Sequence, residues 1–485
     1  MALAIIIFSV LINLPFANQA FHIDDPVNIY LARHIIHHPE NPYGFLMIYN
    51  GAIHSFDRFF ANPPLNGYLL SFMIRLVGEH EIGLHLFFLI YTIFSGWLMF
   101  LISKKFLNGD DQSAFFSAVL LLFSPAFFVM NHTIMMDTPL LCFYLASIYF
   151  FLEAETRPSF YLLAGMFAAL ASLTRYTGMT LIPLFLCMAV LNPKQRSLMS
   201  FWSIIIPMFV FECWYFWTCC LYSSGYWLNI VSYETAQDRC IRIVAHFLAN
   251  IDYLAMASIF PLSWFLLARD KKDQNLFPTR QFQMRFLFFW VALLVVVNSL
   301  FLQTGVKYNL LELPAVILIF VLSLKRLFGQ RTVRLLMITA VLTGFLSMVV
   351  AVADNQLANL YRDYAAKLYF GYKRENNQVY YSGHWGWGYY LQKLGAKSIL
   401  SIRETRTHRG DIILFPSLPW PQPIFGLRLK LLKTVTIRNN FPVRTMNGEA
   451  GAFFYSNYNF PYYIGFFPYA LSMLPLEKFY VLEVQ

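Results

Sequence analysis

The sequence predicts a polytopic α-helical membrane protein of about eleven transmembrane helices, followed by a small C-terminal α/β domain. Composition is the first reason: of the 485 residues, 58% are apolar and 13% are charged, whereas a soluble domain carries roughly 25% charged residues. The second reason is a series of long apolar segments, and the third is a polar final stretch with short β-type runs. A water-soluble globule cannot bury this much apolar surface, so the composition excludes a soluble enzyme, a disordered scaffold and a free nucleic-acid binder.

The apolar segments predict the membrane spans, because a helix needs about 20 mainly apolar residues to cross the bilayer. The segments that meet or approach this length are 2–20, 82–103, 113–131, 138–153, 160–174, 178–192, 199–221, 247–268, 286–303, 309–325 and 333–353. Segment 64–78 is interrupted by Asn66 and Arg75, so we expect it to lie in the membrane interface. The first segment lacks a basic start and a clean cleavage signal, which favours a retained transmembrane helix over a removed signal peptide.

The distribution of Lys and Arg predicts the orientation of these spans. With the N-terminus in the cytoplasm, the inner loops hold 14 cations, which are Lys104, Lys105, Arg157, Lys194, Arg196, Arg269, Lys271, Lys272, Arg280, Arg285, Lys325, Arg326, Arg331 and Arg334. The outer loops hold 7, which are Arg33, Arg58, Arg75, Arg175, Arg239, Arg242 and Lys307. Because Lys and Arg favour the cytoplasmic side, we expect an integral protein of the cell (inner) membrane with a cytoplasmic N-terminus. An odd number of spans then places the C-terminal domain outside the cytoplasm.

The final stretch, 354–485, is polar and rich in Tyr, Pro and Arg. Its β-type runs are 378–383, 397–402, 411–416, 432–437, 451–456 and 478–484, with a helical stretch at 385–397. We therefore expect a membrane domain at 1–353, whose first outer loop 21–81 carries interfacial helices, and an extracytoplasmic α/β domain at 354–485. The chain has no glycine-rich phosphate-binding motif, so nothing in the sequence indicates ATP or dinucleotide binding.

Two adjacent carboxylates, Asp24 and Asp25, follow directly after the first span. Ionisable groups at a membrane boundary are costly and are functional candidates by default. A pair of neighbouring carboxylates also suits general-base chemistry, because each disfavours the ionisation of the other. The alternative is structural: the two acids cap the helix that begins near Asn28, with Asp-Pro as a turn.

Further charged residues are expected on the same side of the membrane. Asp137 stands at the outer start of a span, where a helix cap is the alternative interpretation. Arg175 precedes Tyr176, and Lys307 precedes Tyr308, each at an outer helix end. A cation beside a Tyr hydroxyl can bind a phosphate, whereas the structural alternative is a side chain that snorkels to the lipid headgroups.

The histidines and cysteines predict no metal site. His34, His37 and His38 have a spacing that can hold zinc, with His22 nearby. This arrangement lacks the glutamate of the H-E-x-x-H motif, so we interpret these residues as interfacial histidines. The six cysteines show neither a paired C-x-x-C pattern nor a disulfide framework. No cofactor is predicted. The carboxylates of Asp24, Asp25 and Asp137 could bind a divalent cation, and the sequence does not decide whether they do.

Several segments of the chain resemble those of a known enzyme family. The segment IDDPVNIYLA (23–32) resembles the Asp-Asp/Glu motif of the membrane-embedded GT-C glycosyltransferases. Segments 62–86, 164–183 and 307–318 are similar to the branch that contains the protein O-mannosyltransferases and the aminoarabinose transferases. The pieces SGHWGWGYYLQKLGAKSI and GDIILFP resemble the outer domain of bacterial and archaeal members.

The resemblance implies a GT-C fold and a polyprenyl-phosphate-linked sugar donor. It implies inverting transfer of a hexosyl or pentosyl group, on the outer face of the membrane, to a hydroxyl of a protein, lipid or polysaccharide acceptor. It assigns the family's catalytic aspartate to Asp24, the acidic neighbour of that aspartate to Asp25 and a second carboxylate to Asp137. The donor phosphate is assigned by resemblance to Lys307, Tyr308 and Arg175, and the named branch is regarded as metal-independent.

Three departures from the family pattern qualify this assignment. Asn62 stands where relatives often carry Lys or His, and Asp25 stands where Glu is common. Asn28 replaces the Arg that aminoarabinose transferases have three residues after the acidic pair, which argues against a close aminoarabinose transferase.

The chemistry required of such an enzyme agrees with these residues. The donor already carries an activated leaving group, so the enzyme needs a base for the acceptor hydroxyl and cations for the developing phosphate charge. A lipid or glycolipid transporter (flippase) is the first alternative, but the ionisable residues cluster at outer helix ends and the chain has no internal repeat. A non-catalytic membrane scaffold is the second, and it has no need to bring Asp24, Asp25 and Asp137 beside a cation.

Overall fold

The structure is a computed structural model, and it describes residues 1–49, 52–59, 62–222, 236–270, 278–301, 303–400, 407–456 and 467–485. All structural statements below concern these residues. All six candidate site residues lie among them. Of the cations used to predict the orientation, Lys271 and Lys272 lie outside the described residues.

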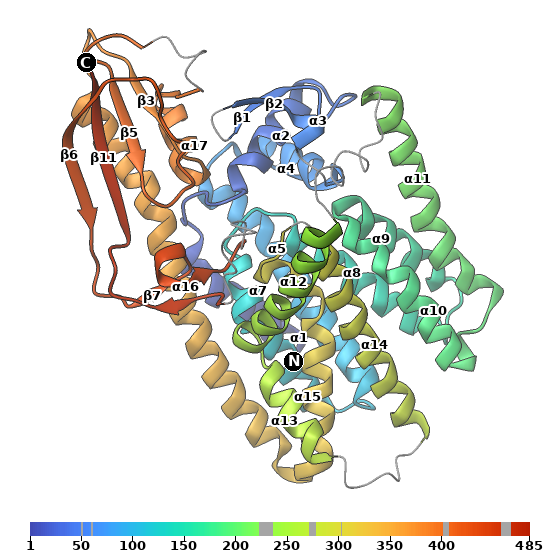
Figure 1. Ribbon diagram of the computed structural model, residues 1–485. Coiled ribbons are helices and arrows are strands. Elements are labelled where there is room, and N and C mark those ends of the chain that lie inside the picture. Colours follow the sequence, from blue (N-terminus) through green and yellow to red (C-terminus); the bar gives the residue numbers. More distant parts are fainter. Residues whose placement is uncertain are drawn as a thin grey trace.

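The chain up to Tyr372 is mostly helical (Figure 1). The helices of this part are α1 (Ala2–Asn13), α2 (Asp25–His37), α3 (Phe56–Phe59), α4 (Leu65–Val77), α5 (Glu81–Phe106), α6 (Asp111–Leu122), α7 (Pro125–Met130), α8 (Asp137–Glu153), α9 (Phe160–Thr174), α10 (Leu181–Leu191), α11 (Trp202–Tyr222), α12 (Ala236–Ala257), α13 (Phe260–Asp270), α14 (Pro278–Leu300), α15 (Leu313–Phe328) and α16 (Thr332–Tyr372). Short 3₁₀ helices include η1 (Leu14–Phe16), η2 (Tyr176–Thr180) and η5 (Val306–Leu311).

Five helical segments among the described residues are long and apolar enough to cross a membrane, and they are Glu81–Phe106, Leu198–Tyr222, Gln237–Ala257, Phe282–Leu300 and Leu313–Tyr372. Other predicted spans are shorter apolar helices or are interrupted. Pro125 starts a new helix inside the predicted span 113–131, because proline fits the first turn of a helix and not its interior. The predicted span 247–268 is likewise divided between α12 and α13. The total of about eleven spans therefore stays a prediction.

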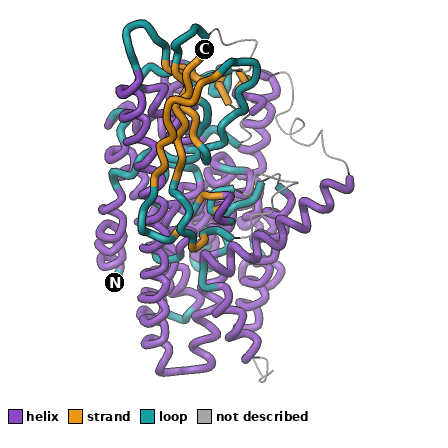
Figure 2. The backbone as a smooth tube through the Cα atoms, turned by 60° about the vertical axis from the view of Figure 1, so that its left-hand side comes forward, coloured by secondary structure: helices purple, strands orange, loops and turns teal. Residues whose placement is uncertain are grey.

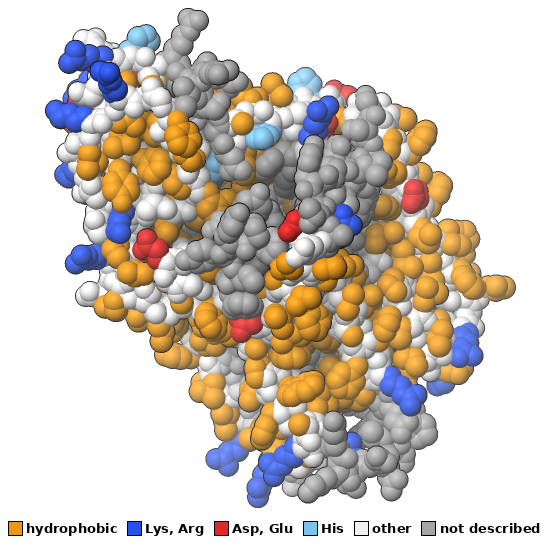
Figure 3. Space-filling view, in the orientation of Figure 1, with side chains coloured by type: hydrophobic (Ala, Val, Ile, Leu, Met, Phe, Trp, Pro, Cys, Tyr) orange, Lys and Arg blue, Asp and Glu red, His pale blue; other side chains and the backbone are white. Residues whose placement is uncertain are grey.

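The surface of the helical part is apolar, as a lipid environment requires. Helices α11, α14 and α16 expose large apolar side chains, among them Phe216, Val296 and Phe345. Figure 3 shows hydrophobic side chains spread over the helical part of this face, with Lys and Arg at its lower end and over the strands at the upper left. Inside, α5, α8 and α9 pack side by side around buried aromatic and aliphatic side chains. The chain is therefore a membrane protein with several apolar helices.

The predicted first outer loop, 21–81, contains helices α2 and α4, and their position in the membrane interface stays a prediction. The helix predicted at 64–78 is α4, and α2 packs against it. Gly67 permits this close packing, since a Cβ atom there would lie 2.7 Å from Leu31 Cδ2. Between the two helices lies an antiparallel hairpin, β1 (Leu46–Tyr49) and β2 (Ala52–Ser55), which the sequence reading did not predict.

The chain after α16, which we call the C-terminal sheet region (residues 373–485), contains a mixed five-stranded sheet of order β4-β3-β5-β11-β6. Its strands are β3 (Val379–Tyr381), β4 (Lys397–Ser398), β5 (Ile412–Pro416), β6 (Leu429–Ile437) and β11 (Glu477–Val484), and α17 (Trp385–Lys393) connects the parallel strands β3 and β4. Shorter strands are β7 (Val443–Arg444), β8 (Met446–Asn447), β9 (Ala452–Phe453) and β10 (Ala470–Leu471). Each predicted β-type run contains a strand. Figure 2 shows the strands gathered beside the upper part of the helices.

Helix α16 crosses the domain boundary that the sequence suggested at residues 353 and 354. It runs without a break from Thr332 to Tyr372, and its final part packs against α17 and β7 (Figure 1). The change from apolar to polar composition at residue 354 marks the place where the surroundings of the helix change. It does not mark the end of the helix, because a polar sequence satisfies the same backbone hydrogen bonds.

Candidate active site

Asp24 ends the turn between η1 and α2, and Asp25 is the first residue of α2. Ile23 adopts a left-handed conformation with φ of 51°, and this turn leads into the helix. Asp24 occupies the N-cap position of α2, yet its side chain makes no capping hydrogen bond. Asp25 Oδ2 accepts a hydrogen bond of 2.9 Å from the backbone N–H of His22, and Oδ1 accepts one of 2.9 Å from that of Ile134. The helix-cap interpretation therefore does not describe either carboxylate.

The two acids have different surroundings. Asp25 is fully buried, and its contact with Ile134 ties the start of α2 to the segment before α8. The side chain of Asp24 is 38% exposed. Of the two, Asp24 is the carboxylate that a substrate can reach.

Lys307 forms an ion pair with Asp24. Its Nζ atom lies 2.5 Å from Asp24 Oδ2, and its side chain is 10% exposed. Lys307 belongs to η5, which connects α14 to α15. The pair therefore joins the turn after the first helix to a loop far along the sequence.

A second ion pair lies close by. The guanidinium of Arg175, between α9 and η2, donates a hydrogen bond to Asp137 Oδ1 at the start of α8. Asp137 is the first residue of α8 and follows the N-cap residue Met136, and both members of the pair are buried. Asp137 therefore acts as the partner of Arg175.

Tyr308 connects the two pairs. Arg175 Cζ lies 4.1 Å from the centre of the Tyr308 ring, and Lys307 Nζ lies 5.8 Å from the same centre. We call the six residues the acid–base cluster, which consists of Asp24, Asp25, Asp137, Arg175, Lys307 and Tyr308. The structure brings all six predicted site residues together. Acids that lie far apart would have favoured the membrane-scaffold alternative, and the acids of this cluster lie close to one another.

The charges in the cluster influence one another. Burial would lower the pKa of Lys307, but Asp24, Tyr308 and Asp137 raise it, and the net result is a pKa above the ordinary lysine value. Lys307 is therefore a cation at neutral pH. Burial raises the pKa of Asp25 to about 8, against the opposing effect of its hydrogen bonds from His22 and Ile134. Asp25 therefore gains a proton far more readily than an exposed aspartic acid.

A buried polar network, missed in the sequence, lies behind the cluster. Asp354 of α16 accepts hydrogen bonds from Tyr455 OH at 2.7 Å and from Thr445 Oγ1 at 2.9 Å. His22 Nε2 lies 3.8 Å from Asp354 Oδ1, and burial lowers the pKa of His22 to about 3. These residues come from three distant parts of the chain. The sequence feature that could have identified Asp354 is its position directly after the predicted span 333–353, where a carboxylate is a candidate for a functional role.

The C-terminal sheet region supports the loop that carries Lys307. The backbone N–H of Val306 donates a hydrogen bond of 2.9 Å to the carbonyl of Phe454. A Cβ atom at Gly305 would lie 2.4 Å from the carbonyl oxygen of Tyr455, so only glycine permits this approach. The position of Lys307 therefore depends on a segment about 150 residues later in the chain.

Two of the histidines, His34 and His38, stack on each other with 5.0 Å between their ring centres. His34 Nε2 pairs with the carbonyl of Asn41 at 2.8 Å, and its ring stacks on Phe45. His22 lies in the network behind the cluster instead. Among the described residues, no group of three or more His, Cys, Asp or Glu side chains is arranged to hold a metal ion. Metal independence stays an expectation.

Two solved structures of one protein are similar to this chain in fold. The crystal structure of ArnT from Cupriavidus metallidurans in the apo state matches with a TM-score of 0.59 at 13% identity, covering 84% of this chain and 92% of that chain. The structure of the same protein bound to undecaprenyl phosphate matches with a TM-score of 0.55 at 12% identity, covering 87% and 95%. The chain has the fold of the GT-C glycosyltransferases. The fold that the sequence resemblance implied is thereby confirmed.

Sequence comparison covers a smaller part of the chain. Residues 61–217 match the family described as dolichyl-phosphate-mannose-protein mannosyltransferase, a range that includes Asp137 and Arg175. A protein of Aquifex aeolicus (strain VF5), described as uncharacterized, is 24% identical over 259 residues. The chain spans about half the length of this curated relative. The roles of the individual site residues stay predictions.

Proposed function

We propose that the protein is an inverting glycosyltransferase that moves a sugar from a polyprenyl-phosphate-linked donor to an acceptor hydroxyl at the outer face of the membrane. The observation that carries this proposal is the pairing of a half-exposed carboxylate, Asp24, with a buried cation, Lys307, beside a second cation, Arg175. One group accepts a proton and the others bind a phosphate. The GT-C fold of the chain and the undecaprenyl phosphate in the similar ArnT structure support the choice of donor.

The donor phosphate is assigned to Lys307, Arg175 and Tyr308. An oxyanion between the two cations satisfies both of them in a site largely removed from water, where charge-assisted hydrogen bonds are strong. Asp137 holds Arg175 in place. When the phosphate engages Lys307, the ion pair with Asp24 opens, and Asp24 becomes available as a base.

The transfer itself is a single displacement. The acceptor oxygen attacks the anomeric carbon while its proton passes to Asp24, and the bond from that carbon to the phosphate oxygen breaks. The polyprenyl phosphate leaves with the electron pair, and its charge is stabilised by Lys307 and Arg175. Attack opposite to the leaving group inverts the anomeric configuration. Asp25, tied to His22 and Ile134, positions the turn that carries Asp24.

We further propose that the N-terminus lies in the cytoplasm and that the acid–base cluster and the C-terminal sheet region lie outside it. The excess of Lys and Arg in the predicted inner loops supports this orientation. A reporter fused after Gln485 should be accessible only from outside the cell. A cytoplasmic signal from that reporter would contradict the orientation.

The proposed activity is tested by analysis of lipids and glycans in a deletion strain. We expect a polyprenyl-phosphate sugar to accumulate and one glycan, glycolipid or glycoprotein to lose a sugar, both by mass spectrometry. A plasmid carrying the wild-type gene should restore both, and one carrying Lys307→Met should not. Unchanged lipid-linked sugars and unchanged glycans would contradict the proposal.

A further inference from the structure

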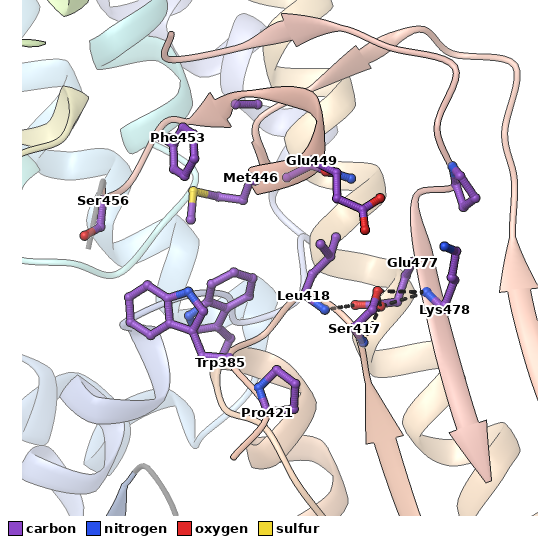
Figure 4. A pocket seen from close by; sticks show the side chains of 15 residues that line it. Trp385, Ser417, Leu418, Pro421, Met446, Glu449, Phe453, Ser456, Glu477 and Lys478 are labelled. Atoms are coloured by element: carbon purple, nitrogen blue, oxygen red, sulfur yellow. Dashed lines mark hydrogen bonds between the residues drawn. The ribbon is translucent and has the colours of Figure 1, made fainter. Parts of the chain in front are cut away.

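A pocket of about 210 Å³ lies in the C-terminal sheet region, outside the acid–base cluster. We call it the tryptophan pocket, and its lining includes Trp385, Trp420, Glu449, Ser456, Glu477 and Lys478. Figure 4 shows Trp385, Met446, Phe453 and Ser456 on one side of the view and Glu449, Glu477 and Lys478 on the other. The pocket therefore has an aromatic side and a polar side.

The two indole rings are held in an unusual way. Trp385 has φ of 55° and Trp420 has φ of 45°, a left-handed conformation that bulky side chains rarely adopt. Their ring centres lie 5.8 Å apart, with 57° between the ring planes. Backbone strain of this kind concentrates where a binding surface has to be preformed. The strain here places two indole rings at one pocket.

The polar groups of the pocket include one without a partner. Ser456 Oγ is buried and has no hydrogen-bond partner among the described residues. Glu477, in contrast, accepts hydrogen bonds from Ser417 and from Tyr361 OH and is fixed (Figure 4). Glu449 is exposed at the rim. A ligand in this pocket is thus offered one hydroxyl inside and an exposed carboxylate.

The chemistry of the lining points to a neutral, hydroxyl-rich ring. The only cation among the lining residues, Lys478, is offset by Glu449 and Glu477, so an anionic ligand such as phosphate finds no excess of positive charge. A lipid chain has no groups that form hydrogen bonds with the polar side of the pocket. A sugar ring presents an apolar C–H face that packs on an indole ring, and its hydroxyls project from its edge towards polar groups. The volume is below the ~300–1,000 Å³ of pockets for larger ligands, which suits a single sugar ring.

The pocket borders the turn that carries Asp24 and the loop that carries Lys307. The ring of Trp385 lies 6.1 Å, centre to centre, from that of His22, which precedes Asp24 by two residues. Ser456 follows Tyr455, whose carbonyl contacts Gly305 next to the Lys307 loop. A donor sugar is bonded directly to the phosphate at Lys307. The tryptophan pocket, one layer of side chains away, therefore suits the acceptor.

We propose that the tryptophan pocket binds one sugar ring of a glycan acceptor, next to the hydroxyl that is modified. This inference rests on the proposed function, and it selects a saccharide among the acceptor classes. The aromatic faces hold the ring, and Ser456 and Glu449 bond its hydroxyls.

The test measures binding of methyl glycosides of mannose, glucose, galactose and N-acetylglucosamine to the purified full-length protein by saturation-transfer NMR. At least one glycoside should bind the wild-type protein. Trp420→Ala should weaken that binding by about tenfold or more, Trp420→Phe should retain most of it, and Glu449→Gln should weaken it several-fold. The matched control Trp264→Ala removes an exposed indole from α13 and should bind like the wild type.

Absence of glycoside binding, or equal binding by the wild type and Trp420→Ala, would overturn the inference. Binding of inorganic phosphate that Lys478→Met abolishes would also overturn it and would assign the pocket to an anion. No donor is present in this experiment, so its outcome is independent of catalysis. Trp420-dependent glycoside binding without any sugar transfer would refute the proposed function alone, and transfer without such binding would refute the acceptor assignment alone.

Discussion

Lys307 Nζ lies 2.5 Å from Asp24 Oδ2, although 283 positions separate the two residues in the sequence. This contact joins the turn after the first helix to the loop before α15. Each residue neutralises the other while the site holds no anion. A phosphate that binds Lys307 therefore changes the state of Asp24, and donor binding and base activation become parts of one event.

Replacing Lys307 by Met should weaken donor binding. The buried site loses the cation that faces the phosphate, and a hydrogen bond to a charged group is typically worth ~1.5–3 kcal/mol, or about 10- to 150-fold in affinity. The measurement is binding of a labelled polyprenyl phosphate to the purified variant in detergent. Lys367→Met, which removes an exposed lysine of α16, is the matched control and should bind like the wild type. Equal affinity of Lys307→Met and the wild type would move the phosphate site to Arg175.

The raised pKa of Asp25 predicts a pH-dependent stability. An acid that holds its proton more tightly when folded contributes stability that is complete below its unfolded pKa of 3.8 and is lost as pH rises towards about 8. Asp25→Asn removes this dependence, and it should also lower stability at acidic pH, because the amide NH₂ cannot accept the second backbone N–H. The difference in melting temperature between wild type and variant should therefore shrink from pH 5 to pH 8. Parallel curves over this range would contradict the raised pKa.

Replacing Gly305 by Ala should lower activity without abolishing folding. The added Cβ would lie 2.4 Å from the Tyr455 carbonyl, so the Lys307 loop has to shift away from the C-terminal sheet region. Misplacement of a catalytic group by about 1 Å costs on the order of 100-fold in rate. The measurement is the transfer rate at saturating donor, with Gly371→Ala as control, since its Cβ meets nothing within 4 Å. Wild-type rates in Gly305→Ala would show that this close approach does not position Lys307.

The sequence predicted the members of the acid–base cluster because the rules of membrane topology place charged residues on one side. Asp24, Asp137, Arg175 and Lys307 all fall at ends of spans that the Lys and Arg distribution assigns to the outer face. Membrane topology predicts on which side of the membrane a charged residue lies, but it does not predict which residue it pairs with. The pairing of Asp24 with Lys307 and of Asp137 with Arg175 required the packing of the helices.

Other features depend on contacts that local sequence does not encode. The hairpin of β1 and β2 is an exception, because Asn50-Gly51, which separates the two strands in the sequence, is a typical hairpin signal. Helix α16 extends to Tyr372 because α17 and β7 pack on its polar part. Asp354 is satisfied by Tyr455 and Thr445, about 100 residues away, so its burial was invisible in a local reading.

The central claim is that Asp24 accepts the proton of the acceptor hydroxyl, and the transfer rate of Asp24→Asn tests it most directly. Asn keeps the size of the side chain but cannot take that proton, and loss of a general base typically costs a factor of about 10² to 10⁴ in rate. The variant should purify like the wild type and bind polyprenyl phosphate at least as tightly, because Lys307 is released from its partner. We predict normal donor binding with transfer slowed by that factor. A variant that binds donor and transfers sugar at the wild-type rate would contradict the claim.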